Sequence, residues 1–331
     1  MRPWELCLPS RGLTAPDAVE LAVLAEELGY GGVWASEAAG HDAVALLAAI
    51  STQTSRARLG TSIVPSATRS PVLLAMGAAT LAQFAPGRIA IGIGASSRVI
   101  IEEWHGRCFG KPLSAIRESL DILNQAFAGE TTNYQGQVHS SRGFKLANPP
   151  TVRPDLFLAA LGPAMRDLAA RRFDGVILNF LPRSRSEEII KQASGAGDPA
   201  CEVAALVRVS VLDEAPGGER RLRKELASYL RVEQYMRWIE GMGYELEHIK
   251  RASDLEEMAS QVPSDLLRDV SVLGDVQSCR AQLEQMCAAG VTPLVIPDTP
   301  VGDLAAMQRI VRSLSPRVDA STQRPTRETL Q

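Results

Sequence analysis

Short apolar runs alternate with stretches of helical period along almost the whole chain. Eight of these runs predict strands, at 4–9, 31–36, 58–64, 88–94, 155–161, 174–180, 202–212 and 292–298. Uninterrupted apolar runs are typical of parallel strands that are covered on both faces. Regular alternation of strand and helix favours a parallel sheet. Eight such units in about 315 residues predict an α/β fold, a single (β/α)8 TIM barrel over residues 1–315.

The segments between these runs predict the helices. Helices are expected at 14–29, 41–54, 71–85, 112–128, 162–172, 184–195, 275–289 and 302–314. Two insertions interrupt the alternation, a polar hairpin near 129–146 and a long helical stretch near 217–260. Residues 95–111 are expected to form a loop, and 270–274 form a short spare strand. The polar residues 316–331 predict a disordered tail.

One segment, GRIAIGIGASS at 87–97, suggests a rival fold. A strand that runs into Gly92 and Gly94 resembles the start of a dinucleotide-binding turn in a doubly wound sheet. The full fingerprint needs a third glycine at the turn into a helix, and this chain has Ser97 there. No ribose-binding residue follows in clear register. The barrel is therefore favoured.

Composition and charge exclude several classes of protein. The formal net charge of −3, without a long basic run, gives no footprint for nucleic acid or for a membrane surface. The longest apolar run, 43–50, is too short to cross a bilayer, and the N-terminus does not have the pattern of a signal peptide. Five scattered cysteines without C-x-x-C spacing predict a reduced cytoplasmic protein.

In a barrel of this kind, the active site lies at the carboxyl ends of the strands. These ends supply Ser10, Arg11, Ser36, Glu37, Ser62, Ile63, Gly94 to Ser97, Leu161 to Pro163, Asn179, Pro297 and Asp298. The set is rich in small residues and has no cluster with metal-ligand spacing, so no metal site is expected. Small residues allow a flat ligand and its phosphate to approach the backbone. A large bound cofactor is therefore favoured over a catalytic nucleophile.

Five segments, in this order, carry a resemblance to a known family. They are LAEELGYGGVWASE, RLGTSIVPSATRSPVLLAMGAATLAQFAPGRIAIGIGAS, WHGRCFGKPLSAIRESLDIL, GETTNYQG and LAALGPAMRDLAARRFDGVIL. Together they resemble the bacterial-luciferase-like superfamily, in its coenzyme F420-dependent branch. That branch includes methylenetetrahydromethanopterin reductase and F420-dependent glucose-6-phosphate dehydrogenase. The resemblance covers roughly residues 1–315.

The resemblance implies a set of cofactor-binding residues. The third strand of this family ends in a bulge with a non-prolyl cis peptide behind the deazaflavin ring, and here this bulge matches Ser62–Ile63. Gly94, Ala95, Ser96 and Ser97 are implied to line the cofactor's ribityl and phosphate side. Ala160, Leu161, Gly162 and Pro163 match the phosphate-binding turn, where a helix N-terminus favours an anion. Asn179 is expected to face the cofactor.

The acid and base residues differ from those of the sugar-phosphate dehydrogenase. Its catalytic histidine is replaced here by Ala38, next to Glu37, and its glutamate acid by Ser97. Glu37 and His41 are the catalytic candidates that remain. Reduction of an activated C=C or C=N bond by hydride from reduced F420 needs less acid–base help than alcohol oxidation. A reductase is therefore favoured.

Each of these roles has a plainer alternative. Arg11 and Trp104 are candidates for contact with a small-molecule substrate, but an ion pair and loop packing would also explain them. His41 can cap a helix, and Ser96 and Ser97 can satisfy loop backbone. Two functional alternatives stay open, an FMN-dependent luciferase-like monooxygenase and a flavin- or deazaflavin-binding protein without turnover. The resemblance also implies a homodimer through helices near the second and third strands.

Overall fold

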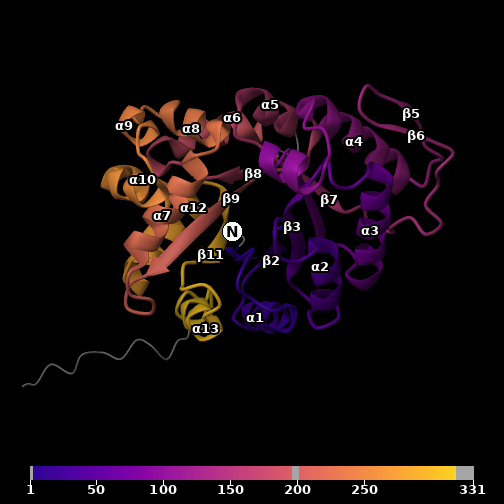
Figure 1. The fold of residues 1–331 in the computed structure, drawn as a ribbon. Coiled ribbons are helices and arrows are strands. Elements are labelled where there is room, and N and C mark those ends of the chain that lie inside the picture. The colour runs from indigo at the N-terminus through magenta and orange to yellow at the C-terminus, as the bar shows by residue number, and fades with distance from the viewer. Residues whose placement is uncertain (1–2, 196–200, 318–331) are drawn as a thin grey trace, which may run out of the picture.

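Eight parallel strands close into a barrel in the computed structural model, which describes residues 3–195 and 201–317 (Figure 1). They are β1 (Glu5–Leu8), β2 (Gly32–Ala35), β3 (Arg58–Pro65), β4 (Ile89–Gly94), β7 (Asp155–Ala159), β8 (Gly175–Asn179), β9 (Glu202–Val211) and β11 (Val291–Pro297). Each strand pairs with the next in this order, and β11 pairs back with β1. The predicted TIM barrel is confirmed, and all eight predicted strands belong to it.

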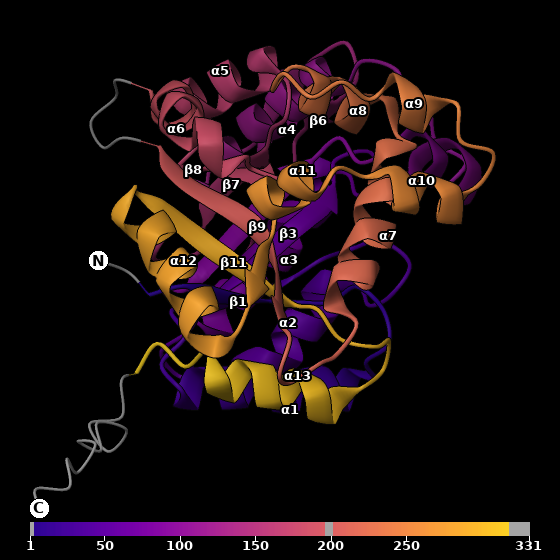
Figure 2. The same cartoon turned by 90° about the vertical axis from the view of Figure 1, so that its left-hand side faces the viewer.

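Eight helices follow the strands and surround the barrel. They are α1 (Ala15–Glu27), α2 (Ala43–Ser51), α3 (Pro71–Phe84), α4 (Pro112–Phe127), α5 (Pro163–Arg172), α6 (Ser186–Ser194), α12 (Val276–Ala288) and α13 (Leu304–Ser313). A side chain at the N-cap begins several of them: Thr14, Asp42 and Ser70 each accept a backbone N–H from the first turn. The last helix, α13, lies beside α1 and completes the ring (Figure 2). Figure 2 shows both below the strands.

The helical insertion differs from its prediction. The expected continuous stretch at 217–260 is broken into α7 (Gly218–Leu230), α8 (Glu233–Glu240), α9 (Glu247–Lys250) and α10 (Leu255–Gln261), and α11 (Ser264–Val270) follows. The break after α8 has a local cause, because Gly243 has a φ of 94°, which a helix cannot include. A separate break at Arg231 and Val232, between α7 and α8, allows α8 to turn back over the end of β8, where Trp238 donates to the Phe180 carbonyl.

Two further segments differ in detail from the sequence prediction. The expected loop at 95–111 contains a π-helix, η1 (Val99–Trp104), preceding α4. One turn with i→i+5 bonding is too short to show a 3.6-residue period, so the sequence pattern could not indicate it. A 3₁₀ turn, η2 (Arg183–Arg185), precedes α6. The spare strand, β10 (Val272–Gly274), pairs with the end of β9 beyond the reach of β8.

Within the polar 129–146 segment, β5 (Asn133–Gln135) and β6 (Ser140–Arg142) pair as an antiparallel hairpin. The carboxylate of Glu118 in α4 fixes the turn, since it accepts backbone N–H groups from three consecutive residues, Gln137, Val138 and His139. Figure 1 shows the hairpin at the outer edge of the molecule. A single domain over 1–315 stays a prediction, and residues 318–331 of the expected disordered tail lie outside the described residues.

Inward-pointing side chains fill the barrel in layers, as parallel strands in a closed barrel require. The middle layer is an apolar cluster of Cys7, Trp34, Ala90, Phe157, Ile177, Ala204 and Leu294. The ring of Trp34 meets that of Phe157 edge to face, with centroids 5.3 Å apart. This layer closes the barrel from below and leaves the carboxyl ends of the strands as its only mouth in the described part of the chain.

Candidate active site

The floor of the barrel mouth is apolar and partly open. Ile63, Leu206 and Ile296 point inward from β3, β9 and β11 and pack on the apolar middle layer. All three side chains stay half-buried, whereas the layer beneath them is sealed. Inward-facing apolar side chains that remain accessible form a surface on which a flat ligand can lie.

A bulge in β3 places Ile63 on this floor. Between Thr61 and Val64 the pairing of β3 with β4 slips by one residue, and the Ser62–Ile63 peptide bond is cis. Neighbouring strands hold the bulge, because Ser36 Oγ donates to the Ser62 carbonyl oxygen at 2.8 Å and Cys7 Sγ lies 3.3 Å from Ser62 Oγ. The predicted cis peptide is confirmed. Contact of Ser62 and Ile63 with a cofactor stays a prediction.

The Gly-Ile-Gly sequence of β4 is explained by the same bulge. A Cβ atom at Gly94 would lie 2.9 Å from Cγ1 and Cδ1 of Ile63, and one at Gly92 would collide with the Thr61 carbonyl oxygen. Glycine is favoured at these two positions, because β3 and the Ile63 side chain pack directly against the backbone of β4. They belong to the barrel wall, not to a phosphate-binding turn.

A strip of small residues leads from Ile63 along the rim. Gly94 lies beside Ala159, since a Cβ at Gly94 would be 3.1 Å from the Cβ of Ala159. Beyond Gly94, the residues Ala95, Ser96 and Ser97 are half-buried. Ser96 has a φ of 62°, and Ser97 Oγ accepts the N–H of Ile100 at 3.3 Å as η1 begins. Ser97 thus satisfies loop backbone while it stays accessible at the rim.

The strip ends at the N-terminus of α5. Ala160 is buried and donates its N–H to the carbonyl of Ile177, and Leu161 is half-buried. Gly162 and Pro163 are exposed, no side chain caps the helix, and a Cβ at Gly162 would meet nothing within 4 Å. This helix end has both the free N–H groups and the space that an anion needs.

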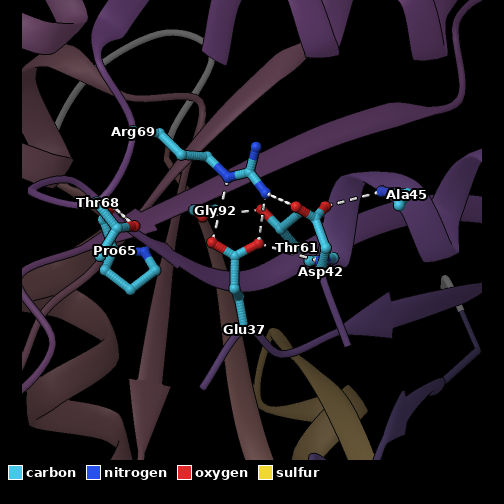
Figure 3. A network of polar contacts seen from close by, with 9 residues as sticks. Glu37, Asp42, Ala45, Thr61, Pro65, Thr68, Arg69 and Gly92 are labelled. Carbon is cyan, nitrogen blue, oxygen red and sulfur yellow. Dashed lines mark hydrogen bonds and ion pairs between the residues drawn. The ribbon is translucent and has the colours of Figure 1, made fainter. Parts of the chain in front are cut away.

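Glu37 lies in a network of charges beside the mouth (Figure 3). Arg69 binds both carboxylate oxygens, with Nε 3.2 Å from Oε1 and Nη2 2.9 Å from Oε2, and Ala43 donates its backbone N–H at 3.1 Å. Asp42 also pairs with Arg69. The hydrogen bonds that Arg69 donates to Glu37 are the main reason that the pKa of Arg69 is raised. Both oxygens of this predicted catalytic carboxylate are therefore occupied.

The other predicted polar residues are placed separately. His41 is half-buried, with Nε2 3.1 Å from the carbonyl oxygen of Leu13, so it joins two loops of the rim. Arg11 is exposed and makes no hydrogen bond or ion pair with the described residues. Trp104 is 51% exposed on η1. The catalytic and substrate-binding roles assigned to these residues stay predictions.

The structure adds two residues that sequence reasoning missed, Arg208 and Tyr235. Asn179, at the end of β8, accepts a hydrogen bond from Arg208 Nη1 and donates one from Nδ2 to Tyr235 Oη at 2.9 Å. The Arg208 guanidinium is 2.8 Å from the Glu225 carboxylate and lies over the ring of Phe180. Strict alternation along β9 would have indicated Arg208, because it faces inward with Ala204 and Leu206.

The charge of Arg208 reaches the interior of the mouth. Burial raises the pKa of the Cys7 thiol, and the positive charge of Arg208 offsets part of that rise. Cys7 Sγ in turn lies 3.3 Å from Ser62 Oγ of the bulge. Directly after β11, burial raises the pKa of Asp298, which is paired with Arg221 of α7 at 3.0 Å.

Among residues 3–195 and 201–317, no three His, Cys, Asp or Glu side chains are grouped to hold a metal ion. No helix in these ranges is long and apolar enough to span a bilayer.

Comparison with known proteins places this geometry in a family. The family model for luciferase-like monooxygenases matches residues 6–293. The chain belongs to this family. The luciferase-like chain is 30% identical over 327 residues to a Mycobacterium tuberculosis protein that carries the name of a coenzyme F420-dependent oxidoreductase, and the match covers 87% of this chain and 93% of the relative.

Two solved structures share the luciferase-like fold. The coenzyme F420-dependent tetrahydromethanopterin reductase from Methanopyrus kandleri matches with a TM-score of 0.74 at 20% identity, over 96% of this chain and 99% of that chain. The oxygenating constituent of 3,6-diketocamphane monooxygenase from Pseudomonas putida, solved with FMN, matches with a TM-score of 0.67 at 17% identity, over 96% and 99%. These likenesses establish the fold.

Proposed function

We propose that this luciferase-like protein is a coenzyme F420-dependent oxidoreductase, and specifically a reductase of activated C=C or C=N bonds in a small organic or natural-product substrate. One observation carries the proposal. The half-exposed apolar floor at Ile63 continues along Gly94 and Ala159 to the uncapped N-terminus of α5. A ligand with a flat ring at one end and an anion at the other matches this surface. The relative named as an F420-dependent oxidoreductase supports the choice.

The residues present fit such a cofactor. Ile63, on its bulge, would support the ring, and the small residues Gly94 and Ala159 leave room for a chain along the rim. The free N–H groups at the start of α5, beside Gly162 and Pro163, would hold a phosphate. When bound, reduced F420 supplies a hydride. The side chains of this protein position the ring, exclude water and hold the substrate.

The ion pair that occupies Glu37 favours reduction over alcohol oxidation. Oxidation of an alcohol needs a base that is free to take the hydroxyl proton. Glu37 is bound by Arg69 at both oxygens, and His41 Nε2 is bound to a backbone carbonyl. Reduction of a polarised double bond requires only a proton donor beside the hydride donor.

An FMN-dependent monooxygenase is the second candidate, favoured by the likeness to the FMN-containing monooxygenase structure. Fluorescence titration of the protein with each cofactor separates the two. We expect F420 to bind with micromolar affinity or better and FMN to bind at least about 10-fold more weakly. Oxidation of reduced F420, followed by the return of its absorbance, should then depend on an added activated alkene or imine.

Micromolar binding of FMN without binding of F420 would overturn the F420 assignment in favour of the monooxygenase. Tight binding of F420 without turnover of any activated alkene or imine would favour a binding protein. A cytoplasmic location is part of the proposal, and it is in keeping with five cysteines that form no disulfide.

A homodimer through α3 is also proposed. Its solvent face carries Leu73, Met76 and Phe84, which are 49%, 49% and 56% exposed. Large apolar side chains on one exposed helix face are typical of an interface. We expect the Met76→Glu variant to sediment as a monomer at concentrations where the wild type is a dimer. A Thr80→Glu control lies on the same face but removes no apolar area, so it should weaken the dimer less. A monomeric wild type would contradict the dimer.

A further inference from the structure

A chain of hydrogen bonds crosses the mouth from β9 to α8. Arg208 Nη1 donates to Asn179 Oδ1, and Asn179 Nδ2 donates to Tyr235 Oη at 2.9 Å. Donation therefore runs in one direction along the chain, from Arg208 to Asn179 and from Asn179 to Tyr235. Because the Tyr235 oxygen accepts, its own proton must point elsewhere, and in the described part of the chain no acceptor takes it.

The surroundings fix Tyr235 over the mouth. Its ring packs edge to face on Tyr229 and Phe180, with centroids 4.8 and 5.9 Å away. Trp238, one turn further along α8, donates its indole N–H to the Phe180 carbonyl at 3.0 Å. The helix is thus held onto the end of β8. The Tyr235 side chain as a whole is half-buried, so part of it stays accessible.

We propose that Tyr235 is the proton donor of the reduction, with Asn179 and Arg208 as positioning residues. The inference rests on the proposed function and names the acid that the reaction needs. Hydride from reduced F420 forms a bond to one atom of the substrate C=C or C=N. The π electron pair moves to the other atom, which takes the proton from Tyr235 Oη. The phenolate that forms recovers a proton from solvent.

We call the chain Arg208–Asn179–Tyr235 the relay. Burial keeps the phenol protonated before the reaction, and the relay stabilises the phenolate that forms. Burial raises the pKa of Tyr235, so the proton stays on the oxygen at neutral pH until the substrate accepts it. The Asn179 N–H and the positive charge of Arg208 limit that rise. The Asn179 N–H points at the oxygen where negative charge develops, and Arg208 holds the Asn179 amide in that orientation. A preorganised donor of this kind stabilises a transition state.

The barrel order places the acid opposite the ring. Ile63 stands on β3, while Asn179 and Arg208 stand on β8 and β9 across the mouth. A substrate between the two sides would meet the hydride donor on the Ile63 side and the phenol on the other. By contrast, Glu37 lies on the β2 side with both carboxylate oxygens bound by Arg69, and His41 Nε2 on the same side is bound to the Leu13 carbonyl.

The first test removes one oxygen. Tyr235→Phe keeps the ring and its aromatic contacts, and Tyr229→Phe is the matched control, because the Tyr229 hydroxyl makes no hydrogen bond with the described residues. The probes are cyclohex-2-en-1-one and 2-methyl-1-pyrroline, each with reduced F420. Tyr235→Phe should lower kcat about 100-fold or more and leave F420 affinity unchanged. The control should keep kcat within about two-fold. Equal kcat in Tyr235→Phe and wild type would overturn the proposal.

The second test reads the relay without turnover. With 3,5-difluorotyrosine at position 235, the phenol is more acidic, and ¹⁹F NMR gives its pKa in the full-length protein. Asn179→Asp keeps an acceptor for Arg208 but loses the donor to Tyr235, and Asn179→Leu loses both without adding charge. Both should raise the phenol pKa by about one unit or more. The same label at Tyr229 should shift far less. An unchanged pKa in both variants would overturn the relay.

The two tests separate this inference from the reductase assignment. A wild type that binds F420 and reduces neither probe, with the expected pKa shifts, would reject the reductase and support the relay. The opposite result is a wild type that reduces the probes, with a phenol pKa at position 235 that is the same in the Asn179 variants as in the wild type. It would support the reductase and reject the relay. In active protein, the solvent isotope effect on kcat should change in Tyr235→Phe, where solvent must deliver the proton directly, and stay at the wild-type value in Tyr229→Phe.

Discussion

Arg58→Met is expected to remove about 3–5 kcal/mol of folding stability at about pH 8, because it leaves the buried carboxylate of Glu5 and the partly buried one of Glu202 without their counter-charge. Arg58 lies at the closed end of the barrel, where it pairs with Glu5 at 3.0 Å and Glu202 at 2.7 Å. Its guanidinium also lies over the rings of Trp34 and Phe157, 5.2 and 5.3 Å from their centroids. Methionine replaces the packing and none of the charge.

The deficit should shrink as the pH falls. Burial already raises the pKa of Glu5, and Arg58 opposes that rise. Without Arg58, the folded-state pKa of Glu5 rises further above its unfolded value. A carboxyl with a raised folded pKa favours folding at low pH, and this contribution is lost as the pH rises through the folded pKa. The variant should therefore recover part of its stability between about pH 8 and about pH 5.5.

Urea unfolding at both pH values measures this difference. Arg56→Met is the matched control, since its side chain is exposed two residues away and should cost no more than about 0.5 kcal/mol. A deficit in Arg58→Met that is as small as the control, or that does not change with pH, would contradict the assignment of a buried charge cluster.

The sequence predicted the barrel because its strands are covered on both faces, which leaves apolar runs with clear ends. It also predicted the cis Ser62–Ile63 bond, through a resemblance that covers the bulge. Contacts between distant segments were out of reach. Nothing near Glu37 in the sequence indicates that Arg69, 32 residues away, occupies its carboxylate. The η1 turn was missed because one π turn has no period to detect.

The hydrogen-bonded group of Arg208, Asn179 and Tyr235 was the hardest part of the site to predict, for a physical reason. Arg208 lies in a strand that is otherwise apolar, and its partners come from β8 and from the insertion. An amphipathic stretch at 217–260 shows which residues face the protein but not which element they cover. The contact between Tyr235 and Asn179 depends on the breaks that divide this stretch into separate helices, and the sequence pattern does not show those breaks.

The two glycines of β4 are expected to respond differently to alanine, and the difference tests where the cofactor lies. At Gly92 the new Cβ would meet the Thr61 carbonyl oxygen, and backbone cannot move aside. Gly92→Ala should therefore cost about 1–3 kcal/mol of stability or more. At Gly94 the new Cβ would meet Cγ1 and Cδ1 of Ile63, a side chain that can rotate, and would lie 3.1 Å from the Ala159 Cβ, which needs to shift only slightly. Gly94→Ala should fold with nearly wild-type stability.

Gly94→Ala should weaken the binding of the cofactor, not the stability of the fold. When Ile63 turns away from position 94, its side chain enters the space above the floor, where the ring is proposed to lie. We expect F420 affinity to fall at least about 10-fold, measured by fluorescence titration. Ile63→Val in the same chain removes one of the two carbon atoms in conflict, so it should restore part of the affinity, and the double-mutant cycle gives the coupling. Wild-type F420 affinity in Gly94→Ala would mean that the ring does not rest on Ile63.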